Sequence, residues 1–167
     1  MLYNVSVPKM PTAPNVWLDA RETRAWRGFH RMRSALLAHL ASELAASCNL
    51  TQAEFEILVV VSEAPGRRIR SRDLSRALHW ERSRLSHQIA RMETRGTITR
   101  AACDSDARGF DVILTPAGLR SIQTAAPLNL EAVRHCFIDV LTDQQLDTLG
   151  DIAEAITTHL ESEHPCS

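Results

Sequence analysis

The stretch from Trp80 to Phe110, WERSRLSHQIARMETRGTITRAACDSDARGF, decides the fold. Placed on a helix at about 100° per residue, Leu85, Ile89 and Met92 share one side. The opposite side carries short or polar residues flanked by arginines: Ser83, His87, Ala90 and Thr94, beside Arg84 and Arg91. The segment is therefore predicted to dock on a core through one face. Its other face would lie close to a duplex while arginines reach phosphates and base edges.

A glycine and a hairpin are predicted after this helix. Gly96 stands where a left-handed residue would end the helix. Residues 97–103 and 110–114 have the composition of strands and flank the turn DSDARG at 104–109. The pattern predicts a recognition helix followed by a wing with Arg108 at its tip.

Four segments of this region resemble a known family. They are RSRLSHQIARMETRG at 82–96, TITR at 97–100, DSDARG at 104–109 and VILTPAG at 112–118. In order and spacing they resemble the winged helix-turn-helix of the MarR family of bacterial transcriptional regulators. The surrounding helices extend the resemblance from about Asp19 to Leu160. It implies a mainly α fold with a small β wing, and a sequence-specific DNA-binding regulator, commonly a ligand-responsive repressor on a pseudo-palindromic operator.

The length of 167 residues fits one domain with a core of its own. The N-terminal stretch is expected to be irregular because Pro8, Pro11 and Pro14 interrupt any helix. The predicted parts are an arm at 1–18, a single MarR-type domain at 19–162 with the winged helix at about 50–115 and dimerisation helices at about 19–47 and 116–162, and a tail at 163–167.

Helix starts are indicated by side chains that can bond to the first turn. Thr51 with Glu54, and Thr142 with Gln145, have the spacing of capping boxes. Ser71 is expected to cap the first helix of the helix-turn-helix. Each signal predicts a helix that begins at the next residue.

Proline and a β-branched residue mark two other elements. Thr115-Pro116 is expected to open a long helix, and Pro127 should bend or split it. Ile69 is expected to form a short strand before the helix-turn-helix. With the two strands of the hairpin, this gives a three-stranded wing.

The charge is unevenly distributed along the chain. The net charge is −1. Residues 67–108 carry eleven arginines against five acids, a net +6, whereas residues 128–167 carry one arginine against eight acids, a net −7. A local basic patch, rather than the average, neutralises phosphates, so this distribution fits a nucleic-acid partner.

The terminal helices have long apolar stripes, and one winged helix has too little core to cover both. The resemblance implies that these helices interlock in a homodimer, which places two recognition helices about one DNA turn apart. The alternative is a compact monomer in which the helices fold back.

The candidate DNA-binding residues are Arg72, Arg82, Ser83, Arg84, Ser86, His87, Arg91, Arg95, Asp106 and Arg108. Arg84 and His87 are expected to read bases in double-stranded DNA, and Arg91 to contact phosphate. Many family members have threonine or valine in place of Arg84, so the operator need not match a typical family site. Taken alone, His87 could be a surface histidine without function.

The wing roles come from the family's D-x-R pattern. Arg108 should enter the minor groove, and Asp106 should orient it. Arg72 and Arg95 are expected to be phosphate contacts or helix-end charges, and the sequence does not separate these two roles.

The family usually binds small phenolic or lipophilic anions between the dimer helices and the DNA-binding lobe. Trp26, His30 and Arg33 lie at helical spacing and could receive such a ligand, although ordinary packing is the simpler interpretation. Two other functions remain as alternatives, a cysteine redox-sensing regulator and a small-molecule-binding or scaffold dimer without DNA binding.

Other classes are disfavoured. No catalytic set, glycine-rich phosphate loop or metal-ligand spacing occurs, so neither an enzyme nor a metal or cofactor is expected. The start of the chain lacks a signal-peptide layout, and no apolar run reaches the length of a membrane span. Cys48, Cys103, Cys136 and Cys166 show no disulfide spacing, which fits the cytoplasm.

Overall fold

The computed structural model describes residues 17–102 and 109–163. The elements are α1 (Ala20–Cys48), α2 (Gln52–Glu63), η1 (Pro65–Arg67), β1 (Arg68–Arg70), α3 (Ser71–Ala77), α4 (Arg82–Thr94), β2 (Ile98–Ala102), β3 (Phe110–Leu114), α5 (Pro116–Val133), η2 (Arg134–Ile138) and α6 (Asp143–Glu163). The predicted fold class, mainly α with a small three-stranded wing, is confirmed. The chain divides into two compact units, with the boundary after Ala35 within α1.

The capping box at the start of α2 forms as predicted. The Glu54 amide donates to Thr51 Oγ1 at 3.2 Å, and the Thr51 amide donates to Glu54 Oε2 at 2.8 Å. Gly66 follows α2 with a φ of +63°, a backbone conformation that glycine adopts without strain. The reciprocal bonds of Thr51 and Glu54 therefore fix the start of α2, and Gly66 follows its end.

The expected cap at Ser71 is wrong. Helix α3 begins at Ser71 itself, and Arg70 occupies the cap position, where no side chain caps the first turn of the helix. Strand β1 ends at Arg70 and leads directly into the helix, so no separate capping residue stands between them.

The turn between α3 and α4 is held by Ser75. The Trp80 amide donates to the Ser75 carbonyl at 2.9 Å, and Ser75 Oγ donates to the Trp80 carbonyl at 2.6 Å. His79 makes the turn with a φ of +51°. These bonds fix the entry to the recognition helix α4.

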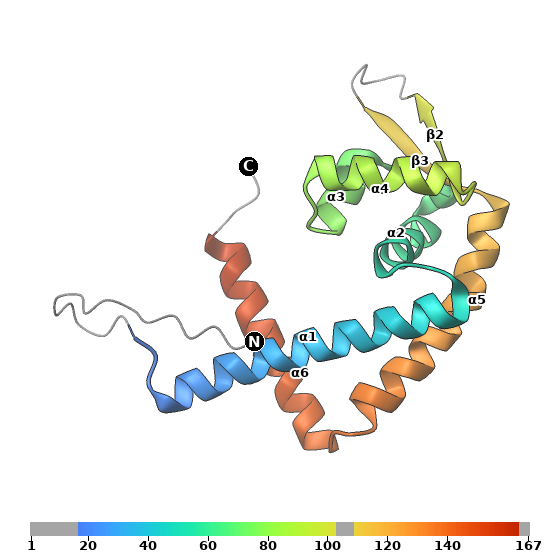
Figure 1. The fold of residues 1–167 in the computed structure, drawn as a ribbon. Helices are drawn as coiled ribbons and strands as arrows, with labels where there is room; N and C mark the ends of the chain where they lie inside the picture. The colour runs from blue at the N-terminus through green and yellow to red at the C-terminus, as the bar shows by residue number, and fades with distance from the viewer. Residues whose placement is uncertain (1–16, 103–108, 164–167) are drawn as a thin grey trace, which may run out of the picture. The chain divides into compact units, whose positions relative to one another are not determined.

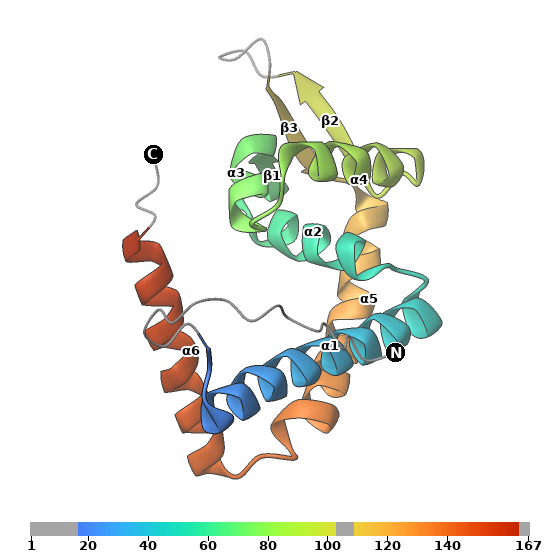
Figure 2. The same ribbon diagram turned by 60° about the vertical axis from the view of Figure 1, so that its left-hand side comes forward.

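The sheet has the strand order β1-β3-β2, and both pairings are antiparallel. Ile69 is opposite Val112, and Ile98 is opposite Leu114. Gly96, with a φ of +73°, has the left-handed conformation predicted for the residue that follows the end of α4. Both views show the hairpin of β2 and β3 projecting past α4 (Figure 1, Figure 2).

One core holds this lobe together. Its members come from the end of α1, from α2, α3 and α4, from the strands and from α5. The largest fully buried side chains are Ile57, Leu58, Val61, Leu74, Ile89, Met92, Ile98 and Val112. Burial of each such side chain stabilises the fold by about 1.5–3 kcal/mol, so packing rather than helix propensity fixes α4 in place.

Helix α5 starts at a closely packed junction with β2. Thr115 Oγ1 accepts from the Gly118 amide at 3.1 Å and donates to the Gly96 carbonyl at 2.7 Å. A Cβ at Gly118 would lie 2.0 Å from the Thr97 carbonyl oxygen, so a side chain does not fit here. Pro127 lies inside an uninterrupted α5, so it does not split the helix, and the π-helix η2 follows after Val133.

Helix α6 differs from the lobe because none of its residues is buried. Its capping box forms, with the Thr142 amide donating to Gln145 Oε1 at 2.9 Å. Ile152, Ile156 and Leu160 are 51%, 55% and 52% exposed. The helix thus leaves its apolar stripe without a partner in the described part of one chain.

Candidate nucleic-acid interface

Helix α4 has the two faces that its sequence predicts. Leu85, Ile89 and Met92 are at most 2% exposed and pack into the lobe core. Ser83, His87, Ala90 and Thr94 on the opposite side are exposed. Because these side chains are short or polar, a duplex could approach the helix backbone closely along this face.

Three arginines of α4 carry charge that no acid in the described part of the chain neutralises. Arg82, Arg84 and Arg91 are exposed, and none of them makes an ion pair within residues 17–102 and 109–163. Arg84 instead stacks on Trp80, with its Cζ 4.0 Å from the ring centroid. Guanidinium groups without a carboxylate partner are free to bind phosphates or base edges.

A hollow of about 370 Å³ lies beside the first turn of α4. Its walls are formed by Ser71, Arg72, Arg82, Leu85, Ser86, Gly109 and Phe110. Two guanidinium groups and two hydroxyls suit a phosphate, which accepts hydrogen bonds from all four. Arg72 also lies 3.4 Å from Asp73, but both side chains are exposed and the pair is correspondingly weak.

Arg95 lies apart from the other candidate residues. Its Nη1 donates to Glu54 Oε1 at 2.8 Å, and its Nη2 donates to the Asn49 carbonyl at 2.8 Å. The Glu54 side chain is only 3% exposed and also accepts from Thr51. Of the two roles left open by the sequence, the structure therefore shows Arg95 in a contact at the helix end that joins α4 to α2.

The wing is described up to its stem. Arg100 on β2 pairs with Glu93 of α4 at 3.0 Å and lies over the Phe110 ring, 5.2 Å from its centroid. Asp106 and Arg108, the predicted minor-groove pair, lie outside the described residues, as do Cys103 and Cys166. The stem is thus fixed to the recognition helix, and the roles of the tip stay a prediction.

Comparison with known proteins identifies the family of this lobe. The model of the MarR family matches residues 49–109. AbsC, a MarR family transcriptional regulator from Streptomyces coelicolor, is similar along most of its length. The two sequences are 38% identical, the match covers 89% of this chain and 99% of the AbsC chain, and the crystal structure of AbsC superposes with a TM-score of 0.83. The chain belongs to the MarR family.

Two further relatives agree with this assignment. Sco3205, a MarR family transcriptional regulator from Streptomyces coelicolor solved in complex with DNA, is 35% identical, covers 86% of this chain and 91% of Sco3205, and has a TM-score of 0.82. The transcriptional regulator HosA from Escherichia coli O111:H- is 26% identical over 119 residues, which are 71% of this chain and 86% of HosA. These relatives are regulators, and family membership makes this chain a transcriptional regulator with a winged helix-turn-helix.

The residues predicted for a ligand of this MarR protein are only partly brought together. The Trp26 and His30 rings meet edge to face at 4.3 Å, with Phe29 beside them, in the first half of α1. Arg33 is exposed. The aromatic wall exists, but within the described residues Arg33 makes no hydrogen bond, ion pair or cation–π contact with it.

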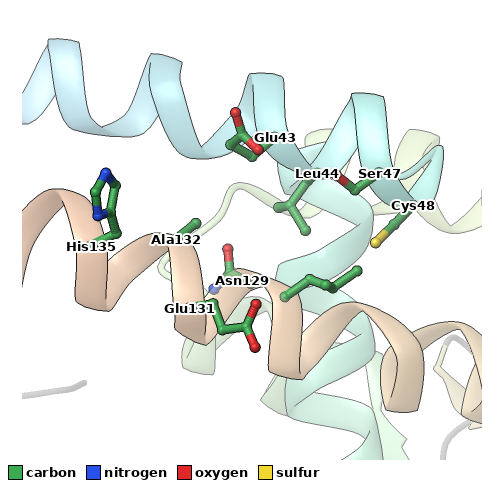
Figure 3. A pocket seen from close by; sticks show the side chains of 9 residues that line it. Glu43, Leu44, Ser47, Cys48, Asn129, Glu131, Ala132 and His135 are labelled. Carbon is green, nitrogen blue, oxygen red and sulfur yellow. The ribbon is translucent and has the colours of Figure 1, made fainter.

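Sequence reasoning missed a groove between the second half of α1 and α5. It has a volume of about 260 Å³ and is lined by Glu43, Leu44, Ser47, Cys48, Leu128, Asn129, Glu131, Ala132 and His135. Figure 3 shows Leu44 and the Cys48 sulfur pointing from α1 toward α5. Two carboxylates and no arginine or lysine line the groove, so it differs in charge from the site expected for an anion.

The remaining candidate chemistries are limited. Among residues 17–102 and 109–163, no three His, Cys, Asp or Glu side chains are grouped to hold a metal ion. In the same ranges Cys48 and Cys136 are free thiols, both half-buried.

No single helix in the described ranges is long and apolar enough to cross a membrane, although α1 and α2 pass this test together as a bent pair by length and composition.

Two other contacts were not predicted from the sequence. Arg84 lies over Trp80, which precedes α4, so the rule for side chains four residues apart on one helix does not indicate this contact. The Arg100–Glu93 pair joins α4 to β2 across a turn, and nothing in the local pattern indicates it.

Proposed function

We propose that this protein binds a specific DNA operator as a homodimer and regulates transcription there. One observation carries the proposal: α4 has three exposed arginines without an acidic partner within residues 17–102 and 109–163, on a helix that the buried Leu85, Ile89 and Met92 fix to the core. Relatives support it, since Sco3205 at 35% identity was solved in complex with DNA. The single MarR-type domain at 19–162 is part of this proposal.

The proposed base contacts are Arg84 and His87, with Ser83 beside them on the exposed side of α4. Arg72, Arg82, Ser86 and Arg91 are the proposed phosphate contacts. Asp106 and Arg108 complete the surface, on the resemblance of the wing to the family's D-x-R pattern. Arg95 is left out because Glu54 and the Asn49 carbonyl already hold it.

The deciding experiment is a fluorescence-anisotropy titration with DNA from immediately upstream of the protein's own gene. A scrambled duplex and several salt concentrations are the controls. We expect binding about a thousandfold tighter than to the scrambled duplex, weakening steeply with salt. Equal, weak binding to both duplexes, repeated after selection from random DNA, would favour a dimer with no DNA-binding role.

A matched pair of variants separates the recognition helix from general charge. The triple change Arg82→Ala, Arg84→Ala and Arg91→Ala should abolish specific binding without lowering the thermal midpoint. The control changes Arg21, Arg24 and Arg27 to Ala, because these are also exposed and remove the same charge from α1. Equal loss of binding in both variants would contradict the role of α4.

The homodimer is proposed on exposed apolar residues that lie in the terminal helices or directly beside them. Within the described residues these are 41–67% exposed: Trp17, Leu18, Trp26, Phe29, Met32, Leu37, Leu128, Leu130, Val140, Ile152, Ile156 and Leu160. Single apolar residues at a surface are common, but a stripe along a whole helix marks an interface. Dimerisation is typical of the family.

Light scattering at micromolar concentration tests the dimer. We expect the mass of two subunits for the wild type and a shift toward one subunit for Ile156→Glu. The matched control is Thr158→Glu, because it lies roughly opposite Ile156 on α6. A mass of one subunit for the wild type would refute the dimer.

We further propose that a small molecule releases the DNA, since ligand-responsive repression is typical of the family. Two places differ in charge. Arg33 lies on the same helix as Trp26 and His30, while Glu43 and Glu131 line the groove. If aromatic carboxylates release the DNA and Arg33→Ala abolishes this release, the ligand site lies beside Trp26 and His30. If amines release the DNA and Glu131→Gln abolishes this release, the ligand site is the groove.

An enzymatic role is not proposed. We propose a cytoplasmic location, because a bacterial regulator must reach its operator in that compartment. Oxidative release of DNA is the remaining alternative for regulation. If peroxide released the operator and Cys103→Ser abolished this release, the sensor would be a thiol rather than a ligand site.

A further inference from the structure

Trp80 is fixed in place before any DNA is bound. Its amide donates to the Ser75 carbonyl at 2.9 Å, and its carbonyl accepts from Ser75 Oγ at 2.6 Å. Ser75 is only 8% exposed, and the half-buried Trp80 packs against the lobe core. Neither the backbone nor the ring is therefore free to move far.

Arg84 lies over this fixed ring. Its Cζ is 4.0 Å from the centroid of the Trp80 ring, a distance at which a cation is attracted to an aromatic face. Within residues 17–102 and 109–163, no carboxylate or carbonyl accepts a hydrogen bond from Arg84. The ring contacts the centre of the guanidinium group, and the N–H donors of Arg84 have no hydrogen-bond acceptor within the described residues.

This arrangement suits one base more than the others. Guanine presents two acceptors, O6 and N7, in the major groove, and an arginine binds both in one plane. Arg84 is the third residue of α4, and the N-terminal residues of a recognition helix are the ones that contact base edges. A guanidinium group that is already held against a fixed ring loses less rotamer freedom on binding a base than a freely moving one.

We propose that Trp80 is a specificity-determining residue, which holds Arg84 so that α4 reads a guanine in each half-site of the operator. This inference rests on the proposed DNA-binding function. Arg82 and Arg91, the other unpaired arginines of α4, make no such stack in the described ranges, so they are assigned to phosphates.

The test is selection of duplexes from a random pool, followed by titration of single-base variants of the selected operator. Wild-type protein should enrich a guanine at one position of each half-site, and replacing that guanine should weaken binding by about tenfold or more. Arg84→Ala should lose the preference at this position alone. Arg91→Ala should weaken binding to all variants alike and keep the preference.

Trp80 is tested by two substitutions and a double-mutant cycle. Trp80→Leu should reduce the guanine preference by about two- to fivefold, the value of an exposed cation–π contact, whereas Trp80→Phe should keep most of it. In an Arg84→Ala background, Trp80→Leu should have no further effect on that position. A merely structural role would instead lower the affinity for every variant together.

The two proposals fail in different ways. An operator enriched by the wild type, with an unchanged guanine preference in Trp80→Leu, would overturn the role of Trp80 and leave DNA binding intact. If the wild-type protein enriches no sequence at all, both the role of Trp80 and specific DNA binding are overturned. If Trp80→Leu does not fold, Trp80→Met replaces it, because methionine is apolar and adapts to irregular packing but has no aromatic face. An unchanged guanine preference in Trp80→Met would contradict the role of Trp80.

Discussion

Two sets of arginines lie on the same winged-helix lobe, and they differ in what they contact. Arg68, Arg95 and Arg100 pair with Asp111, Glu54 and Glu93, respectively. Arg82, Arg84 and Arg91 make no ion pair within the described residues. The comparison teaches that a basic stretch of sequence overstates the charge available to DNA, because part of it stabilises the lobe.

The largest expected effect comes from the paired set. Arg95→Ala would leave the buried Glu54 carboxylate with the two donors of Thr51 alone, which should lower the free energy of unfolding by about 1–3 kcal/mol. Urea denaturation measures this change. Arg91→Ala on the same helix is the control and should stay within about 0.5 kcal/mol of the wild type. Equal stability of the two variants would remove the distinction between the sets.

The unpaired set should show its effect in DNA binding instead. Arg91→Ala is expected to weaken operator binding by about 1 kcal/mol, roughly fivefold, and to reduce the slope of log K against log salt by about 1. Anisotropy titrations over a salt series give both quantities. Arg95→Ala, measured where it is fully folded, should keep the wild-type slope. A reduced slope in Arg95→Ala would mean that Arg95 also contacts phosphate.

The smallest effect is expected where a pair is exposed. Arg76 lies 3.5 Å from Asp73, but their side chains are 69% and 40% exposed. Arg76→Ala should therefore change the free energy of unfolding by less than about 0.5 kcal/mol. Urea denaturation beside Arg95→Ala checks this prediction. A loss as large as that of Arg95→Ala would show that burial of the acid is not what separates strong from weak pairs.

Features set by residues three or four apart could be predicted from the sequence. The capping boxes at Thr51 and Thr142 and the buried side of α4 depend on local spacing, and all three are present. The cap at Ser71 failed because the preceding strand runs directly into the helix, which local spacing does not show.

Contacts between distant residues could not be predicted in this way. Arg95 and Glu54 are 41 positions apart, and only the packing of α4 against α2 brings them together. The sequence therefore left Arg95 open between a phosphate contact and a helix-end charge, although the structure places its guanidinium group against Glu54 and leaves that of Arg91 exposed. The stack of Trp80 and Arg84 is local, but it also needs the turn that Ser75 holds.

The junction at Gly118 has a consequence for how movement passes through the lobe. A single Cβ would collide with the Thr97 carbonyl oxygen, and the Thr115 hydroxyl bonds to the carbonyls of Gly96 and Thr97 across the same junction. These contacts join the end of α4, the base of the wing and the first turn of α5. A tilt of α5 would therefore carry the wing stem with it, and a regulator built this way can alter the fit of its wing to DNA without unfolding any element of the lobe.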